Sequence, residues 1–210
     1  MFLAFKMSVC LTGPPLSPLD GWLIIDVPVS DEPNTKRVSI RKRRAGHDSG
    51  IDVMSVRLIR IRVPVAVEDP AAEVSVETLV PPERHGHVID AVVFDNRRRG
   101  RPYRYVYAKC MVGARPRNYC DAACRVDVID GSVVTWCEAP ALIPSGPTTF
   151  VPRPGAAEDD ETDGVVLIDC MGSDGHAVFV VLDAASFTEV ARVVLPHRHC
   201  WSYRNTWIQA

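Results

Sequence analysis

Four cysteine and histidine side chains in the second half of the chain are the clearest candidates for metal chemistry. They are Cys120, Cys124, His197 and His199. Thiolate sulfur and imidazole nitrogen are the usual ligands of tetrahedral zinc. The spacing combines Cys-x3-Cys with a distant His-x-His pair, which is unusual for zinc, and buried structural cysteines account for it more simply. A zinc-stabilised β module is therefore a minor alternative.

An acidic run at residues 158–163 places carboxylates at the offsets of a calcium loop. Asp159, Glu161 and Asp163 alternate along this run. A calcium loop closes with a bidentate glutamate, but the corresponding position holds Cys170, and no helical pattern flanks the run. We therefore expect a solvated acidic loop rather than a calcium site.

Two basic runs, residues 41–44 and 97–99, raise the question of nucleic-acid binding. Both lie in expected turns, and the chain carries 24 Lys and Arg against 26 Asp and Glu, a formal net charge of -2. This balance gives no overall attraction to nucleic acid or to an anionic membrane. The sequence also contains no Gly-x-Ser-x-Gly elbow and no phosphate-binding glycine loop. We expect solubilising loop charges and no nucleic-acid partner.

The elements that must position these side chains are short strands. Prolines (17) and glycines (13) separate runs that are rich in valine, and β-branched runs bounded by such residues are typical of strands. The pattern predicts an all-β chain without an amphipathic helix of useful length. The expected strands are residues 22–29, 37–41, 56–63, 73–80, 103–107, 124–129, 133–136, 164–169, 176–183 and 189–195.

Turn signals join these runs into antiparallel units. Asp130 and Gly131 give the strongest hairpin signal, because Asp-Gly between two strands favours a tight turn. Residues 173–175, Ser-Asp-Gly, predict another turn. Units of two to four strands recur at about 40–50 residues, the spacing of propeller blades. The pattern alone leaves a sandwich or a barrel open.

Length and composition set wider limits. The 210 residues, 47% of them hydrophobic, fit one folded domain. We place this domain at residues 20–210, after a poorly defined segment at residues 1–19. No apolar run approaches the roughly 18 residues of a membrane-spanning helix. Seven cysteines, an odd number without a dense disulfide pattern, favour a reducing compartment such as the cytoplasm or a plastid.

Two stretches carry a more specific signal. The first is residues 144–155, Pro-Ser-Gly-Pro-Thr-Thr-Phe-Val-Pro-Arg-Pro-Gly, which continue through the acidic run into residues 163–198. The second comprises residues 90–95, Asp-Ala-Val-Val-Phe-Asp, and residues 100–107, Gly-Arg-Pro-Tyr-Arg-Tyr-Val-Tyr. Together they closely resemble the C-terminal half of the carotenoid cleavage dioxygenases, the family that also contains the retinoid isomerohydrolases. The resemblance covers residues 20–210.

The resemblance implies an architecture and a chemistry. The fold would be part of a seven-bladed antiparallel β-propeller, of which this chain supplies about four blades or fewer. Proteins of that family hold Fe(II) on four histidines, three of them backed by glutamates, beside a tunnel that admits a polyene. There O2 cleaves a carotenoid or apocarotenoid double bond into two carbonyl products. Neutral imidazoles suit Fe(II), and the carboxylates behind them fix the ring tautomer.

This sequence departs from the family at its iron site. The contexts Leu-His-Asp and His-x-Asn-Ala do not occur, and residues 203–207, Tyr-Arg-Asn-Thr-Trp, replace a terminal aromatic-His-Gly-x-Trp segment. Arg204 therefore occupies the position of the fourth histidine, and a guanidinium cannot offer a lone pair to a metal. By resemblance, Asp90 matches a glutamate that supports a ligand histidine. His85 and His87, like the two later histidines, do not match the ligand spacing.

The family's Ser-Glu-Pro is also changed, to Ser-Gly-Pro at residues 145–147. We therefore expect no catalytic residue and no iron site in this chain, and interpret it as a truncated or degenerate family member that is inactive alone. The alternative from another class is a non-enzymatic propeller-fragment binding or scaffold protein. In either case, open sheet edges favour self-association or the capture of a partner. The transcript sequence upstream of Met1 would distinguish the truncated family member from the scaffold protein.

Overall fold

The computed structural model describes residues 10–11, 21–30, 56–65, 71–84, 89–112 and 120–198. Within these residues almost all regular structure is β, with two 3-10 turns at Pro82–Arg84 and Asn96–Arg98. The strands are β1 (Cys10–Leu11), β2 (Trp22–Ser30), β3 (Val56–Pro64), β4 (Ser75–Val80), β5 (Ile89–Val93), β6 (Tyr105–Cys110), β7 (Ala122–Asp127), β8 (Val133–Trp136), β9 (Leu142–Pro144), β10 (Thr149–Pro152), β11 (Gly164–Gly172), β12 (His176–Asp183) and β13 (Glu189–Arg198).

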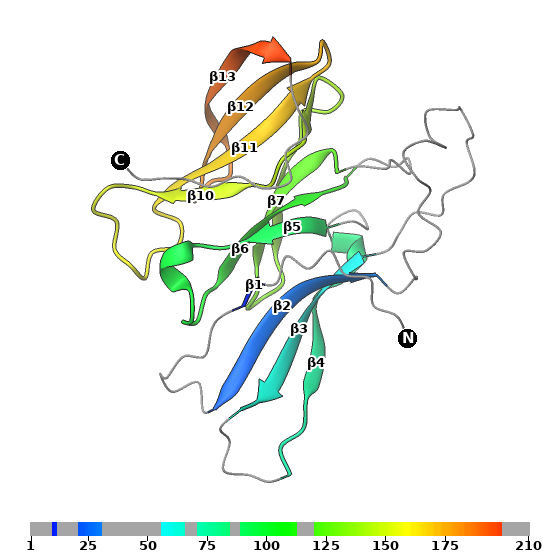
Figure 1. Cartoon of the computed structure of the whole chain (residues 1–210), viewed down its shortest axis with the longest axis vertical. Coiled ribbons are helices and arrows are strands. Elements are labelled where there is room, and N and C mark those ends of the chain that lie inside the picture. The colour runs from blue at the N-terminus through cyan, green and yellow to red at the C-terminus, as the bar shows by residue number, and fades with distance from the viewer. Residues whose placement is uncertain are drawn as a thin grey trace, which may run out of the picture.

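The strands form three antiparallel sheets that follow one another along the chain (Figure 1). We call them sheet A (β1-β2-β3-β4), sheet B (β5-β6-β7-β8) and sheet C (β10-β11-β12-β13, with β9 also paired to β11). Within each sheet, β9 apart, each strand pairs with the next in sequence, which is the meander expected of propeller blades. Sheet B lies between the other two (Figure 1).

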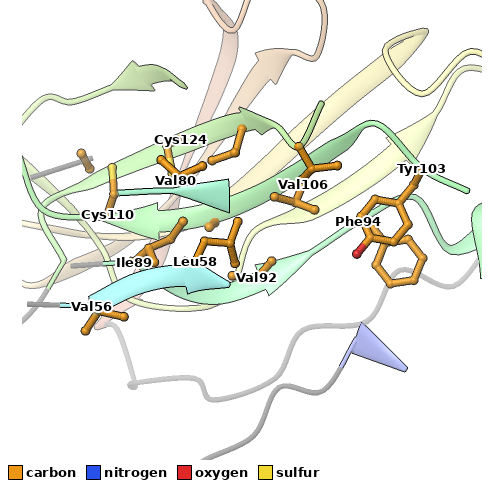
Figure 2. Packing of buried hydrophobic residues seen from close by; sticks show 14 residues of the cluster. Val56, Leu58, Val80, Ile89, Val92, Phe94, Tyr103, Val106, Cys110 and Cys124 are labelled. Carbon is orange, nitrogen blue, oxygen red and sulfur yellow. The ribbon is translucent and has the colours of Figure 1, made fainter. Parts of the chain in front are cut away.

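One face of sheet B packs against sheet A. Because successive side chains of a strand alternate between faces, Val106, Ala108 and Cys110 of β6 point to the same side. They share a buried cluster with Leu58 of β3 and Val80 of β4 (Figure 2). The interface is mainly aliphatic.

The other face of sheet B packs against sheet C. Tyr107 of β6 and Ala123 of β7 belong to a second buried cluster, whose remaining members come mostly from β10 to β12 and the residues after them. The Tyr107 ring stacks on Phe150 with centroids 5.5 Å apart and lies 6.4 Å from Phe187. This interface is aromatic at its centre, and both faces of sheet B are buried.

The two turns expected between strands are present. Gly131 follows β7 with φ of 70°, and its N–H donates to the carbonyl of Asp127 at 2.9 Å. Gly175 links β11 to β12 with φ of 83°. Both lie in the left-handed region that glycine adopts without a Cβ penalty, so the turn chemistry predicts these two hairpins correctly.

Most expected strands are confirmed, with ends shifted by a few residues. The expected strand at residues 37–41 lies outside the described residues. Four strands were not expected, namely β1, β5, β9 and β10. Each is five residues or shorter, and such runs give too few alternations for a period-2 pattern to register. Among the described residues, no helix is long and apolar enough to cross a membrane.

Candidate functional site

Asp90 lies on β5, the first strand of sheet B, and is exposed. Its Cα partner is Lys109 of β6, and the pairing is irregular between Asp90 and Val93. Ala91, next to it, has φ of 55°, a left-handed conformation that a residue with a Cβ rarely adopts. Such irregular edges recur beside functional sites. The structure thus presents the Asp90 carboxylate at a kinked edge strand.

The two stretches that carried the family resemblance contact each other through Glu161. Its carboxylate accepts the backbone N–H of Arg104 at 2.8 and 3.0 Å and that of Tyr105 at 3.2 Å. The Tyr107 hydroxyl donates to the Glu161 carbonyl at 2.9 Å. Glu161 is only 7% exposed, and burial raises the pKa of its carboxyl. The expectation of a fully solvated acidic loop is therefore wrong at this residue.

Arg97 fastens the same acidic loop to sheet B. Its guanidinium pairs with Asp95, Nε lying 2.9 Å from Oδ2, and also donates to the carbonyls of Ala156, Ala157 and Asp160 at 3.0–3.2 Å. Asp95 is buried. The interpretation of residues 97–99 as solubilising charge is therefore wrong for Arg97, which is a structural connector. The other basic run, residues 41–44, lies outside the described residues.

A buried carboxylate connects sheet A to sheet B. Asp26 of β2 is fully buried and receives two hydrogen bonds of 2.8 Å from the Arg60 guanidinium on β3. The hydroxyl of Tyr103, just before β6, donates to the same carboxylate. The Tyr103 ring stacks on Phe94 with centroids 4.9 Å apart. This group fixes the start of the Arg-Tyr-x-Tyr strand against sheet A.

The described residues of the expected zinc set are not brought together. Cys120, just before β7, and Cys124, on β7, are buried, whereas His197 is exposed on β13 of another sheet. His199 lies outside the described residues. Burial raises the pKa of the Cys120 thiol to about 12, and a hydrogen bond with Cys124 together with burial raises that of Cys110. Buried thiols in apolar surroundings are typically structural and unreactive.

The described residues do not fit an iron centre either. They include two histidines, His176 and His197, both on sheet C, and no group of three histidine, cysteine or acidic side chains close enough to hold a metal. Four neutral imidazoles would be needed for the family's Fe(II). Arg204 lies outside the described residues, as do His85 and His87. Two histidines are too few for such a site, so no iron chemistry is assigned to the described residues.

Sequence reasoning singled out Asp90 but missed the side chains that join the sheets. Asp26, Arg60, Arg97 and Glu161 all belong to ordinary charged patterns in the sequence. Their roles depend on contacts 34 to 63 residues apart, which no local spacing reveals. The available signal was indirect: Glu161 and Tyr105 each fall within one of the two resembling stretches.

The sequence profile described as retinal pigment epithelial membrane protein matches residues 20–209. The chloroplastic carotenoid cleavage dioxygenase 8 of Arabidopsis thaliana is 36% identical over 173 residues, which are 82% of this chain and 28% of that protein. Homolog A of the same enzyme from Oryza sativa subsp. japonica is 36% identical over 163 residues, 77% of this chain and 28% of that protein. The chain thus spans less than a third of these relatives.

Solved structures agree in fold. The cobalt-substituted apocarotenoid oxygenase of Synechocystis superposes with a TM-score of 0.72 at 24% identity, covering 91% of this chain and 37% of that chain. At this identity the likeness shows the fold alone. The three sheets are therefore part of an antiparallel β-propeller, with sheets A, B and C as consecutive blades.

Proposed function

This chain belongs to the retinal pigment epithelial membrane protein family of carotenoid oxygenases, and from that premise we propose that it forms the C-terminal blades of a carotenoid-cleaving propeller. The unit that we assign to this role is residues 20–210, and the preceding segment, residues 1–19, contributes β1 to sheet A. The match across nearly the whole chain is the observation that supports the proposal.

The reaction that we propose for the complete propeller is oxidative cleavage of a carotenoid or apocarotenoid. One carbon–carbon double bond breaks, and each carbon receives one oxygen atom of O2, so that two carbonyl products account for all atoms. Fe(II) is the cofactor of this chemistry in the family. The described residues do not fit that ion, so no step is assigned to them.

We further propose that this chain is catalytically inactive alone. Arg204 stands where the resemblance places a ligand histidine, and its permanent positive charge would repel a divalent cation. Asp90 would be a former support for a ligand histidine; it lies exposed at the kinked edge of β5. A carboxylate at that edge is able to orient an imidazole supplied by another blade.

The role proposed for the signature stretches in this chain is to join blades. Glu161, Arg97 and Tyr107 connect the acidic loop, which precedes β11, to sheet B through hydrogen bonds of 2.8 to 3.2 Å. A propeller needs such connections because each blade is stabilised mainly by its neighbours. The described contacts therefore favour a structural role for these motifs.

An anaerobic Fe(II) titration of the full chain and of its Arg204→His variant tests the inactivity. We expect no stoichiometric, high-affinity binding in either protein, because one restored imidazole cannot build a four-ligand site. An oxygen-consumption assay with β-carotene and with an apocarotenal accompanies the titration. Tight iron binding, or oxygen-dependent cleavage by the unmodified chain, would overturn the proposal.

A second candidate function is a non-enzymatic scaffold that uses its terminal sheets to bind a partner. The observation that favours it is the exposure of apolar side chains there. Seven of the ten exposed large hydrophobic residues of the described part lie at β3–β4 or β12–β13, and they are Val65, Val74, Val76, Phe179, Val190, Val193 and Val194. Exposed apolar surface at a sheet favours self-association or capture of a partner.

A further inference from the structure

Three buried cysteine side chains lie where β6 pairs with β7, and the proposed function uses none of them. Cys110 is the last residue of β6, and Cys124 lies within β7. The side chains of both are 0% exposed. Cys120, also buried, precedes β7 and lies outside the paired residues of the two strands. Two of the three thiols are therefore positioned by the strand pairing.

The strand register puts Cys110 and Cys124 on one face of sheet B. Cys110 is the Cα partner of Ala122, and Cys124 is the partner of Ala108. Directly paired residues share a face, and so do residues two apart along a strand. The two cysteines are therefore diagonal neighbours on the face that packs against sheet A. Their side chains are joined by a hydrogen bond.

Sheet A covers both thiols. Cys110 and Cys124 share a buried cluster with Leu58 of β3 and Val80 of β4, which are also fully buried (Figure 2). The hydrogen bond with Cys124 and burial raise the pKa of Cys110, and a protonated thiol is a poor nucleophile. The pair is therefore protected from oxidation while sheet A is in place.

A hydrogen bond also joins sheet B to this cover. The hydroxyl of Tyr103, just before β6, donates to the buried carboxylate of Asp26 on β2. On the opposite face of sheet B, the Tyr107 hydroxyl donates to the carbonyl of Glu161, in the loop before β11, at 2.9 Å. The two tyrosines thus make comparable contacts on the two sides of sheet B, so each side can be loosened separately.

We propose that Cys110 and Cys124 form a reversible disulfide when sheet A opens away from sheet B, so that this interface controls a redox modification site. The oxidant is hydrogen peroxide. A thiolate of the opened pair attacks one peroxide oxygen, and the O–O bond breaks to give a sulfenic acid and, after protonation, water. The second thiol displaces another water and forms the S–S bond. Two thiols and one peroxide thus give one disulfide and two water molecules.

The diagonal placement favours a bond that is easily reduced. Diagonal neighbours on antiparallel strands have Cα atoms about 7–8 Å apart, whereas a disulfide usually spans about 4.4–6.8 Å. The bond must therefore draw β6 and β7 together locally, and strained disulfides are the readily reduced ones. Addition of dithiothreitol should restore both thiols.

Timed treatment of the full chain with hydrogen peroxide, followed by alkylation and peptide mass spectrometry without reduction, tests this inference. Trypsin separates Cys110 from Cys124 by cleaving after Arg117, so the disulfide is detected as two joined peptides. The matched variants are Tyr103→Phe, which removes the hydroxyl contact to sheet A, and Tyr107→Phe, which removes the contact on the other side.

We expect the joined peptides to form at least about fivefold faster in Tyr103→Phe than in the unmodified chain. Loss of one hydrogen bond increases the population in which sheet A is open by about that factor. Tyr107→Phe should match the unmodified chain. Equal acceleration by both variants would overturn the proposal, because oxidation would then require opening of the whole chain. Absence of the joined peptides from every protein would overturn it as well.

A second pair of variants identifies the cysteine that reacts with Cys110. Cys120 and Cys124 lie in the same tryptic peptide. Cys124→Ala should abolish the joined peptides, and Cys120→Ala should retain them, because only Cys124 is positioned by the strand pairing. The reverse result would contradict the assignment. The inference goes beyond carotenoid cleavage, and its readout involves neither iron nor carotenoid, so failure of the proposed function would leave it unchanged.

Discussion

Strands β6 and β13 both contain valine but lie in opposite environments. β6 lies inside sheet B, where Val106, Tyr107 and Ala108 are fully buried by the sheets on either side. β13 ends sheet C, and Val190, Val193 and Val194 are exposed although they lie in a regular strand. The burial of a strand's side chains therefore depends on whether its sheet lies between two others, and not on the strand's composition alone.

The charged side chains around sheet B and at β13 also differ in burial and in pairing. Sheet B is joined to sheet A by the hydrogen bond from Tyr103 to the buried Asp26, which also pairs with Arg60 inside sheet A, and to sheet C by the Glu161 carboxylate and the Arg97 guanidinium. At β13 the principal ion pair, Arg192 with Glu138 and Glu189, is partly exposed. Buried charge needs complete pairing, while exposed pairs contribute little. The polar contacts around sheet B should therefore contribute more to the free energy of unfolding than the ion pairs at β13.

The largest effect is expected from Asp26→Ala, which breaks the connection between sheets A and B. The substitution leaves the Arg60 guanidinium without its partner, and removing one member of a buried pair costs about 3–5 kcal/mol. The control Tyr103→Phe removes one hydrogen bond to the same carboxylate and should cost about 1–2 kcal/mol. Urea unfolding measures both. Equal losses would show that the ion pair is not the dominant contact.

A smaller effect should distinguish the two strands directly. Val106→Ala removes methyl groups from a fully buried site and should lower the free energy of unfolding by about 2 kcal/mol. Val193→Ala makes the same change at an exposed site and should alter it by less than about 0.5 kcal/mol. If Val193→Ala proved as costly as Val106→Ala, the description of sheet C as an outer one of the three sheets, with Val193 exposed, would be wrong.

The smallest effect is expected at Glu161 and depends on pH. Glu161→Gln replaces a carboxyl that accepts two backbone N–H groups and should cost about 1 kcal/mol at low pH, where the carboxyl is protonated. Burial raises the pKa of Glu161 above its ordinary 4.5. Its contribution to stability is therefore present below that value and declines as the pH rises through the raised pKa.

Urea unfolding of both proteins across this pH range measures the difference. The stability advantage of the unmodified chain over Glu161→Gln should shrink as the pH increases. Asp159→Asn, which changes an exposed neighbour, is the control and should show no such trend. An advantage that grows with pH would mean that hydrogen bonding to the carboxylate outweighs its burial.

The sequence predicted the strands that are long and alternating, such as β3 and β12, together with the turns at Gly131 and Gly175. It also predicted the family and the fold class, because the two resembling stretches are specific. It could not predict which strand faces are buried, since valines in β6 and β13 look alike. The contacts of Glu161 and Arg97 were missed because they join residues far apart in the chain. The role of Asp90 stays a prediction.

Amide hydrogen exchange along the whole chain, followed by NMR, tests most directly whether sheet B is the middle one and sheet C an outer one of the three described sheets. At a concentration below the onset of association, the paired amides of β6 and β7 should be the slowest, because their exchange requires global unfolding. The paired amides of β13 should exchange at least about 100-fold faster through local opening. Protection of β13 equal to that of β6 would contradict the arrangement of blades described for this chain.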